Sequence, residues 1–306
     1  TSTTGDVILK GTGGDFGNGG YGIGLATGSL VELHGGNVDL FGSNISLDAS
    51  SITNTGTGTI DLDAEWFIDI RNNSLLSVID GNLTINANAG RPLIGDFTAI
   101  DVENSSLLTT GLGDIALTGR GGDGLFGEPS GSRGIRLYNG TTLSSAGTMT
   151  GAGGIALHGE GGDGNYGYEG IYLAGSTTSI TSENGAISLT GIGGDSNDGG
   201  SIGILMVENA TIHSTGLAPN AATITLHGTG GGIGSYNTGV FISDYSTGIH
   251  SAYGDILITG IGGGDGEGLS NYGIRLQNIY ETIASTGAGT DAAKITLHGT
   301  GGDGFF

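Results

Sequence analysis

The sequence predicts an all-β protein: a right-handed parallel β-helix of about nine to ten coils, each with three short strands, and with long Gly-Gly-Asp loops along one edge. Gly113–Leu137 carries the pattern, since Ile115-x-Leu117 is followed by a Gly-Gly-Asp-Gly run and then by Ile135-x-Leu137. Apolar residues at period two are typical of strands with one buried face, and glycine clusters are typical of turns. So short a unit cannot bury its apolar face alone, and copies must stack.

The first strand of each unit has an apolar anchor that recurs every 22 to 40 residues. These anchors are Val7, Val38, Ile60, Leu83, Ile115, Ile155, Ile187, Ile224, Ile256 and Ile295. Two residues further along the strand we expect a buried ladder, in which each residue lies one coil from the next. Its members include Leu117, Leu157, Leu189, Leu226, Ile258 and Leu297. A charge in this ladder should break the stack, because an unpaired buried charge is costly.

The shortest units show the bare coil. In 38–59, anchors at Val38/Leu40, Ile45/Leu47 and Ile52 predict three strands within 22 residues. Longer units lengthen mainly the connection between strands one and two. A constant strand frame with variable loops on one edge is typical of a parallel β-helix. A left-handed β-helix would show a hexapeptide repeat, and a propeller needs four antiparallel strands per blade, so both are disfavoured.

The composition limits the partners. The chain has 306 residues with 68 glycines, no cysteine and a formal charge of −22, so it has no disulfides or thiolate metal sites. Nucleic acid and anionic membranes require clustered Lys and Arg, and we expect neither as a partner. No apolar run approaches the ~20 residues of a membrane span, so the protein is not expected to span a membrane. Divalent cations, basic partners or a salty exterior fit this charge better.

We expect residues 1–306 to form one β-helix repeat domain. The sequence begins and ends within the repeat pattern, without the polar caps that solenoids need. This predicts either a segment of a longer solenoid or the subunit of a head-to-tail filament. Self-association, end to end or lateral, is therefore the expected interaction.

Repeats of the form G-x-I-x-L-[TH]-G-x-G-G-D, followed by G-I-x-L and an I-x-S strand, are clearest over residues 113–306. This style resembles bacterial filamentous-haemagglutinin-like exoproteins, which are large adhesins with right-handed β-helical shafts, secreted by two-partner or autotransporter routes. The resemblance implies a secreted or cell-surface structural protein that forms a rod, filament or sheath, with adhesion to a cell-surface glycan or protein as a further role. It carries no catalytic residue across, and we do not expect an enzyme.

Gly-Gly-Asp runs suggest calcium, because calcium-binding β-rolls place aspartates between consecutive turns. Asp123, Asp163 and Asp195 lie on three successive coils and form the best candidate site; the other runs end at Asp15, Asp265 and Asp303. The order is GGDGxxG rather than GGxGxDxUx, and glycine with aspartate also suits tight turns. Both the turn and the cation interpretations stay open.

An acidic cluster is predicted on the outer face of the first strands. Asp39 and Asp61 occupy equivalent positions in adjacent coils, and Asp63 follows two residues along. Such carboxylates raise one another's pKa, bind a cation, or serve polysaccharide cleavage. A polysaccharide-binding or polysaccharide-cleaving β-helix protein is thus the alternative function. A solvated acidic face is the plainer interpretation.

A stripe of large side chains is predicted on the outer face of the second strands, over five successive coils. It comprises Arg136, Tyr172, Leu205, Phe241 and Arg275. Outward apolar residues on stacked coils suit contact with another protein, a neighbouring rod or a sugar ring. Cover by a long Gly-Gly-Asp loop is the competing interpretation.

Overall fold

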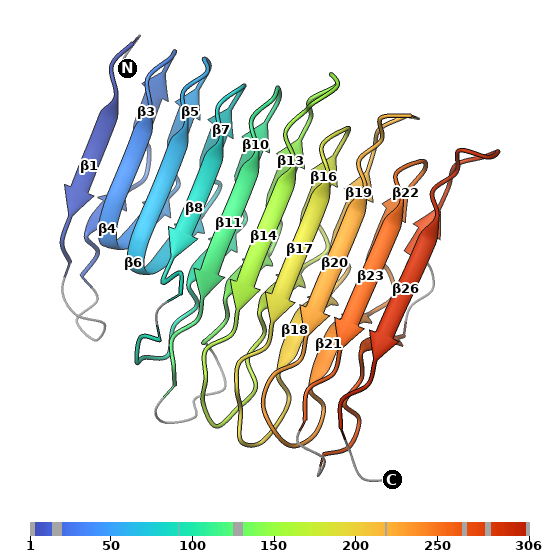
Figure 1. Ribbon diagram of the computed structural model, residues 1–306. Helices are drawn as coiled ribbons and strands as arrows, with labels where there is room; N and C mark the ends of the chain where they lie inside the picture. Colours follow the sequence, from blue (N-terminus) through green and yellow to red (C-terminus); the bar gives the residue numbers. More distant parts are fainter. Residues whose placement is uncertain are drawn as a thin grey trace.

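The computed structural model is all-β and solenoid-like, with parallel pairing between its strands (Figure 1). It describes residues 4–13, 20–90, 92–124, 131–217, 219–264, 268–278 and 283–303. Within these ranges the chain forms no helix, and so none that is long and apolar enough to cross a membrane. Strands of successive units lie side by side in chain order, from the blue end of the molecule to the red end (Figure 1).

The first strands of the units form one parallel ladder. They are β1 (Val7–Gly11), β4 (Val38–Asp48), β6 (Ile60–Arg71), β8 (Leu83–Ala87), β11 (Ile115–Arg120), β14 (Ile155–Glu160), β17 (Ile187–Ile192), β20 (Ile224–Thr229), β23 (Ile256–Ile261) and β26 (Ile295–Thr300). Each predicted anchor pairs with the next one, from Val7 with Val38 to Ile256 with Ile295. The predicted register is confirmed along the whole ladder.

The second strands continue the same sheet. They are β2 (Ile23–Leu25), the second halves of β4 and β6, β9 (Ile100–Glu103), β12 (Ile135–Tyr138), β15 (Ile171–Ala174), β18 (Ile202–Val207), β21 (Thr238–Ser243) and β24 (Ile274–Gln277). The third strands form a separate sheet. They are β3 (Leu30–Leu33), β5 (Ser51–Asn54), β7 (Leu75–Val78), β10 (Ser106–Thr109), β13 (Thr142–Ser145), β16 (Ser179–Ser182), β19 (Thr211–Ser214), β22 (Gly248–Ser251) and β25 (Ile283–Ser285).

The core lies between the two sheets, where the inward residues of all three strand sets stack on their equivalents. Leu117, Leu157, Leu189, Leu226 and Ile258 are at most 2 % exposed, as the ladder predicts. Leu297 is the exception, with 45 % of its surface exposed. It lies on β26, which pairs on one side only, with β23, so a single neighbouring unit covers it.

The units that start at Val38 and Ile60 differ from the prediction of three separate strands. Here strands one and two are continuous, as β4 and β6, which bend around the lower edge without a loop (Figure 1). The register shifts at the bend: Gly42 pairs with Ala64, but Asn44 pairs with Phe67. β6 therefore carries one extra residue, a β-bulge at Glu65–Trp66, which takes up the corner that other units cross with a long connection.

In the longer units, the connection between strands one and two begins and ends at a close approach of two glycines. A Cβ added to Gly191 would lie 2.1 Å from the carbonyl oxygen of Gly203, and one added to Gly228 would lie 2.1 Å from that of Gly239. Real Cβ atoms do not come so near a carbonyl oxygen. Glycine is thus required where the loop leaves β17 or β20 and returns at β18 or β21.

Candidate functional site

The predicted calcium aspartates do stack, but they bind backbone. Asp123 Oδ1 accepts a hydrogen bond from the N–H of Asp163 at 3.0 Å, and Asp163 Oδ1 accepts one from the N–H of Asp195 at 2.8 Å. Asp195 Oδ1 accepts from the N–H of Gly232 at 3.2 Å. Each carboxylate thus fixes the loop of the following unit. Asp15 and Asp265 lie outside the described residues.

Arg120, at the end of β11, provides a positive charge between these loops. Its guanidinium lies 2.8 Å from Asp123, 3.0 Å from Asp163 and 3.0 Å from Glu160, while its side chain is only 8 % exposed. In the described part of the chain, no group of three or more His, Asp or Glu side chains is arranged to hold a metal ion. The repeat pattern does not predict this role of Arg120, although the residue directly precedes the Gly-Gly-Asp run.

Replacing Arg120 by methionine should destabilise the protein increasingly as pH rises. Burial and the neighbouring Asp123 and Asp195 raise the pKa of Asp163, while Arg120 lowers it. An aspartate with a raised pKa supports the fold below its unfolded pKa, and that support is lost as pH rises through the folded pKa. Removing the cation increases this loss of stability at high pH. We expect the variant to lose about 1–2 kcal/mol of unfolding free energy at pH 7 and less near pH 4, where the carboxylates take up protons. The loss is no larger because the carboxylates are partly exposed.

The measurement is the Tm of wild type and Arg120→Met between pH 4 and 7. Arg120→Lys keeps a positive charge and should recover part of the difference. A constant Tm difference across this range would show that Arg120 acts by packing alone.

The predicted acidic cluster is present on the outer face of β4 and β6. Asp39 pairs in register with Asp61, and Asp63 follows two residues along β6. Burial first, and then the charges of Asp61 and Asp6, raise the pKa of Asp39. Asp61 accepts a hydrogen bond from the Thr59 hydroxyl at 2.7 Å. Asp63 is exposed and lines a hollow, described below, whereas Asp39 and Asp61 do not.

The five residues of the second-strand stripe pair in one column, as predicted. Tyr172, Leu205 and Phe241 are half-buried rather than exposed. The guanidinium of Arg133 lies 4.7 Å from the centre of the Tyr172 ring. That of Arg275 lies 4.7 Å from the Phe241 ring centre. Arginine side chains, rather than loops alone, thus cover part of the stripe.

The two arginines of the stripe have different environments. Arg136 forms a bidentate ion pair with Asp101, with Nε to Oδ1 at 2.7 Å and Nη2 to Oδ2 at 2.5 Å. Arg275 donates instead to Gln277 Oε1 at 2.6 Å. The ion pairs found among the described residues involve four other arginines and not Arg275. Through Asp101, Arg136 belongs to a polar cluster that includes Asp69 and Arg71 on β6.

That cluster lines a hollow of about 360 Å³, here named the Asp101 hollow, on the second-strand face of β6, β9 and β12. Asp69 pairs in register with Asp101, which pairs with Arg136. Arg71 Nη1 lies 3.0 Å from Asp69 Oδ2, and the Tyr21 hydroxyl donates to the same oxygen at 3.4 Å. The remaining lining residues are Phe67, Asp96, Phe97, Thr98, Glu103, Gly131 and Tyr138.

The carboxylates of this hollow lie close to each other and are partly desolvated. The pKa of Asp69 is raised, first by burial and also by Asp101, while Arg71, the Tyr21 hydroxyl and Arg136 oppose the rise. Burial and Asp101 likewise raise the pKa of Tyr138. The site places the acceptors Asp69 and Asp101 beside the donors Arg71 and Arg136. Such an arrangement suits ligands that carry hydroxyl groups, since each hydroxyl both donates and accepts.

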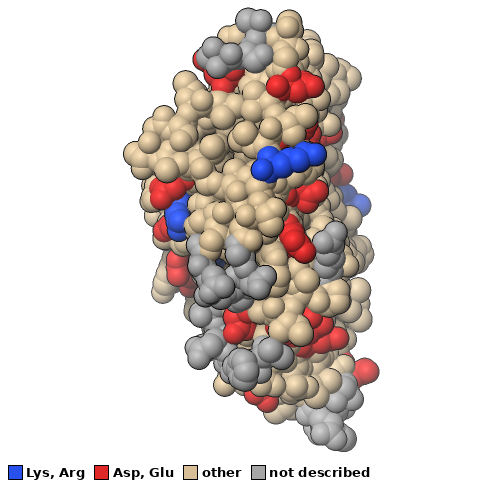
Figure 2. Space-filling view, turned by 90° about the vertical axis from the view of Figure 1, so that its left-hand side faces the viewer, with Lys and Arg blue, Asp and Glu red and all other residues tan. Residues whose placement is uncertain are grey.

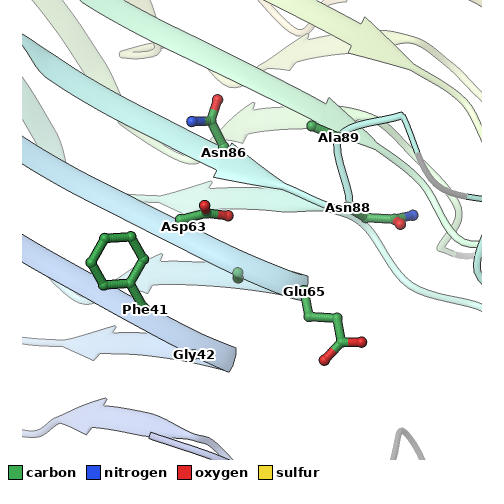
Figure 3. A pocket seen from close by; sticks show the side chains of 8 residues that line it. Phe41, Gly42, Asp63, Glu65, Asn86, Asn88 and Ala89 are labelled. Carbon is green, nitrogen blue, oxygen red and sulfur yellow. The ribbon is translucent and has the colours of Figure 1, made fainter. Parts of the chain in front are cut away.

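A second hollow, of about 610 Å³ and here named the Asn86 hollow, lies on the first-strand side of the same corner. Phe41, Asp63 and Asn86 lie next to one another on β4, β6 and β8, with Glu65 and Asn88 beyond them (Figure 3). Gly42, Ala64 and Ala89 complete its lining. Phe41 is 40 % exposed. The Asn86 hollow thus contains one residue of the predicted acidic cluster, Asp63.

The predicted stripe begins at Arg136, so it does not include Asp69 and Asp101 of the two preceding units. The signal was present: I-D-I-R at 68–71 and I-D-V-E at 100–103 align with I-R-L-Y at 135–138. Extending the second-strand column by two units would have found both carboxylates. Nothing in the sequence pattern predicted that Phe97 would pack against β6.

In comparisons with protein-family models, with curated proteins and with solved structures, nothing matches this chain.

Proposed function

We propose that the protein is a secreted or cell-surface structural protein, whose shaft is a right-handed parallel β-helix of nine to ten coils with three strands each. The main support is the unbroken register of first strands from β1 to β26, with an apolar ladder beneath it. At ~4.8 Å per strand, ten first strands extend roughly 40 Å. The repeat style that resembles filamentous-haemagglutinin-like exoproteins points the same way, toward the bacterial cell surface.

The surface charge fits an exposed shaft. The chain carries 30 acidic against 8 basic residues. Viewed from the β1 end, acidic side chains are spread over the visible face and outnumber the basic ones (Figure 2). Like charges keep such rods soluble and apart, and salt or a basic partner lowers that repulsion. Lateral or end-to-end association should therefore strengthen with ionic strength.

Labelling of the cells that make the protein tests the surface location. Antibodies against the chain should decorate intact cells in electron microscopy, and external protease should remove the label. Label confined to the cell interior would contradict the proposal. Small-angle scattering of the chain in solution checks the length and cross-section of the rod separately.

Calcium between Asp123, Asp163 and Asp195 stays the open alternative to a turn, and removal of divalent cations tests it. Because backbone N–H groups and Arg120 already bind these carboxylates, we expect EDTA to leave the Tm unchanged. A ligand bound only to the folded state must raise the Tm. A fall in Tm with EDTA that calcium reverses would therefore establish the cation site.

The alternative function is polysaccharide binding or cleavage, favoured by the two hollows on either side of the β6 corner. For cleavage, Asp39, Asp61 and Asp63 are the first candidates. Release of reducing ends from a panel of polysaccharides, with Asp61→Asn as the comparison, tests this. Equal release by wild type and variant would remove Asp61 from the mechanism. The stripe from Arg136 to Arg275 remains the proposed contact for a protein, a neighbouring rod or a sugar ring.

A further inference from the structure

The two hollows lie on one strand, β6, at the point where the loop edge is interrupted. β4 and β6 turn the corner directly, whereas residues 88–99 separate β8 from β9 and residues 121–134 separate β11 from β12. One hollow is lined by the first half of β6, with Asp63 and Glu65, and the other by the second half, with Asp69 and Arg71. β6 itself therefore runs from one hollow to the other without a loop of its own.

Aromatic side chains occupy the corner between the hollows. The bulge gives β6 two adjacent residues, Glu65 and Trp66, where β4 has one, and Phe67 follows. Phe97 lies 5.7 Å from Trp66 and 6.4 Å from Phe67, measured between ring centres, and Tyr21 lies 5.9 Å from Phe67. Bulges at such positions re-aim side chains, and aromatic rings offer flat apolar surface. The order along β6 is thus carboxylates, aromatic rings, carboxylates.

The charges select among ligands. The described residues of the two linings include six carboxylates and two guanidinium groups, those of Arg71 and Arg136. Both arginines are paired, with Asp69 and Asp101 respectively. An acidic ligand would meet repulsion, because both cations among the described lining residues are already paired, whereas the hydroxyl groups of a neutral sugar can donate to the carboxylates. Volumes of about 610 and 360 Å³ lie within the range of small-ligand sites.

We propose that the outer edge of β6 binds an uncharged polysaccharide chain, which passes from the Asn86 hollow over Trp66 and Phe67 into the Asp101 hollow. This inference rests on the adhesive and polysaccharide-binding part of the proposed function and names its ligand class. Asp63 and Glu65 bind hydroxyl groups at one end, and Asp69 and Asp101 bind them at the other. The aromatic rings of the corner contact the apolar face of the intervening sugar.

Trp66 makes the test direct, because it is the only tryptophan of the chain. Linear hexasaccharides of glucose, mannose and N-acetylglucosamine are titrated into the protein while tryptophan fluorescence is recorded, with a galacturonic acid hexasaccharide, with and without calcium, as the acidic arm. We expect a saturable change with at least one neutral hexasaccharide. No saturable change with any neutral sugar, or binding of the acidic sugar alone, would overturn the proposal.

Two variants and one control locate the binding. Asp69→Asn changes the Asp101 hollow, and Glu65→Gln changes the Asn86 hollow. Each variant should weaken binding of the neutral hexasaccharide about tenfold or more, as expected when a hydrogen bond to a charged group is lost. Glu32→Gln makes the same chemical change as Glu65→Gln on β3, in the separate third-strand sheet and outside both hollows, and should leave binding unchanged. Because Glu65 is exposed, Glu65→Gln should fold normally, and it can test the proposal even if Asp69→Asn folds poorly.

Equal weakening by Glu32→Gln would mean that the overall charge of the protein, and not the outer edge of β6, controls binding, and would contradict the proposal. The result is separate from the surface location of the protein. If the protein is labelled on the cell surface but binds no neutral glycan, only the proposed binding along β6 is refuted. If it binds glycan but is found only inside cells, the proposed surface shaft is refuted.

Discussion

Leu189→Asp is expected to destabilise the protein by more than about 4 kcal/mol, and to prevent folding at ordinary temperatures. Leu189 is fully buried on β17, between Leu157 of β14 and Leu226 of β20. A carboxylate at this position has apolar neighbours above and below, so it must either remain charged without a partner or take up a proton. Both states cost free energy, and the damage spreads because each unit depends on its neighbours.

The control is the same substitution at the last position of the same ladder. Leu297 is 45 % exposed, so an aspartate there reaches water and should cost less than about 1 kcal/mol. Circular dichroism and thermal unfolding of the two variants make the comparison. Similar Tm values for Leu189→Asp and Leu297→Asp would contradict a continuous buried ladder.

Gly191→Ala is expected to cost about 3 kcal/mol, although it adds one methyl group. The new Cβ would lie 2.1 Å from the carbonyl oxygen of Gly203, and its nearest contacts are backbone atoms, which cannot rotate away. β17 or β18 must therefore shift, and both are paired with strands on either side. The backbones of Gly191 and Gly203, where the connection leaves β17 and returns at β18, would be forced apart.

Gly24→Ala is the matched control, since a Cβ at this glycine of β2 meets no atom within 4 Å. Alanine loses less backbone entropy on folding than glycine, so this variant should be neutral or stabilised by up to about 1 kcal/mol. Urea unfolding of both variants measures the difference. Equal stability of Gly191→Ala and wild type would show that the two glycine backbones do not need their close approach.

Much of the strand frame could be predicted from the sequence because it repeats. A period of two places Leu189 inward, and recurrence of the same pattern assigns its neighbours as Leu157 and Leu226. Burial of apolar area favours one register only, since a shift by one residue would expose the whole ladder. The column of Arg136 and Tyr172 on the opposite face followed from the same register.

The candidate site was predicted less completely, because it depends on departures from the repeat. Arg136 pairs with Asp101 while Arg275 donates to Gln277, a difference that arises from which side chain lies one strand away. The extra residue in β6 shows only in the pairing with β4. Phe97 reaches Trp66 from a loop of the following unit, and loop paths carry no periodic signal.

Hydrophobic periodicity acts identically in every unit, so the amino-acid pattern is enough to predict the strand anchors, the buried ladder, the side on which the long loops occur and the columns of outward residues. Folding adds three features that this pattern does not contain. Arg120 lies between the loop carboxylates, β4 and β6 turn the corner as continuous strands, and Asp63, Trp66 and Asp69 follow one another along β6 between two hollows. These features come from contacts between units of unequal length, and such contacts exist only after the units have stacked.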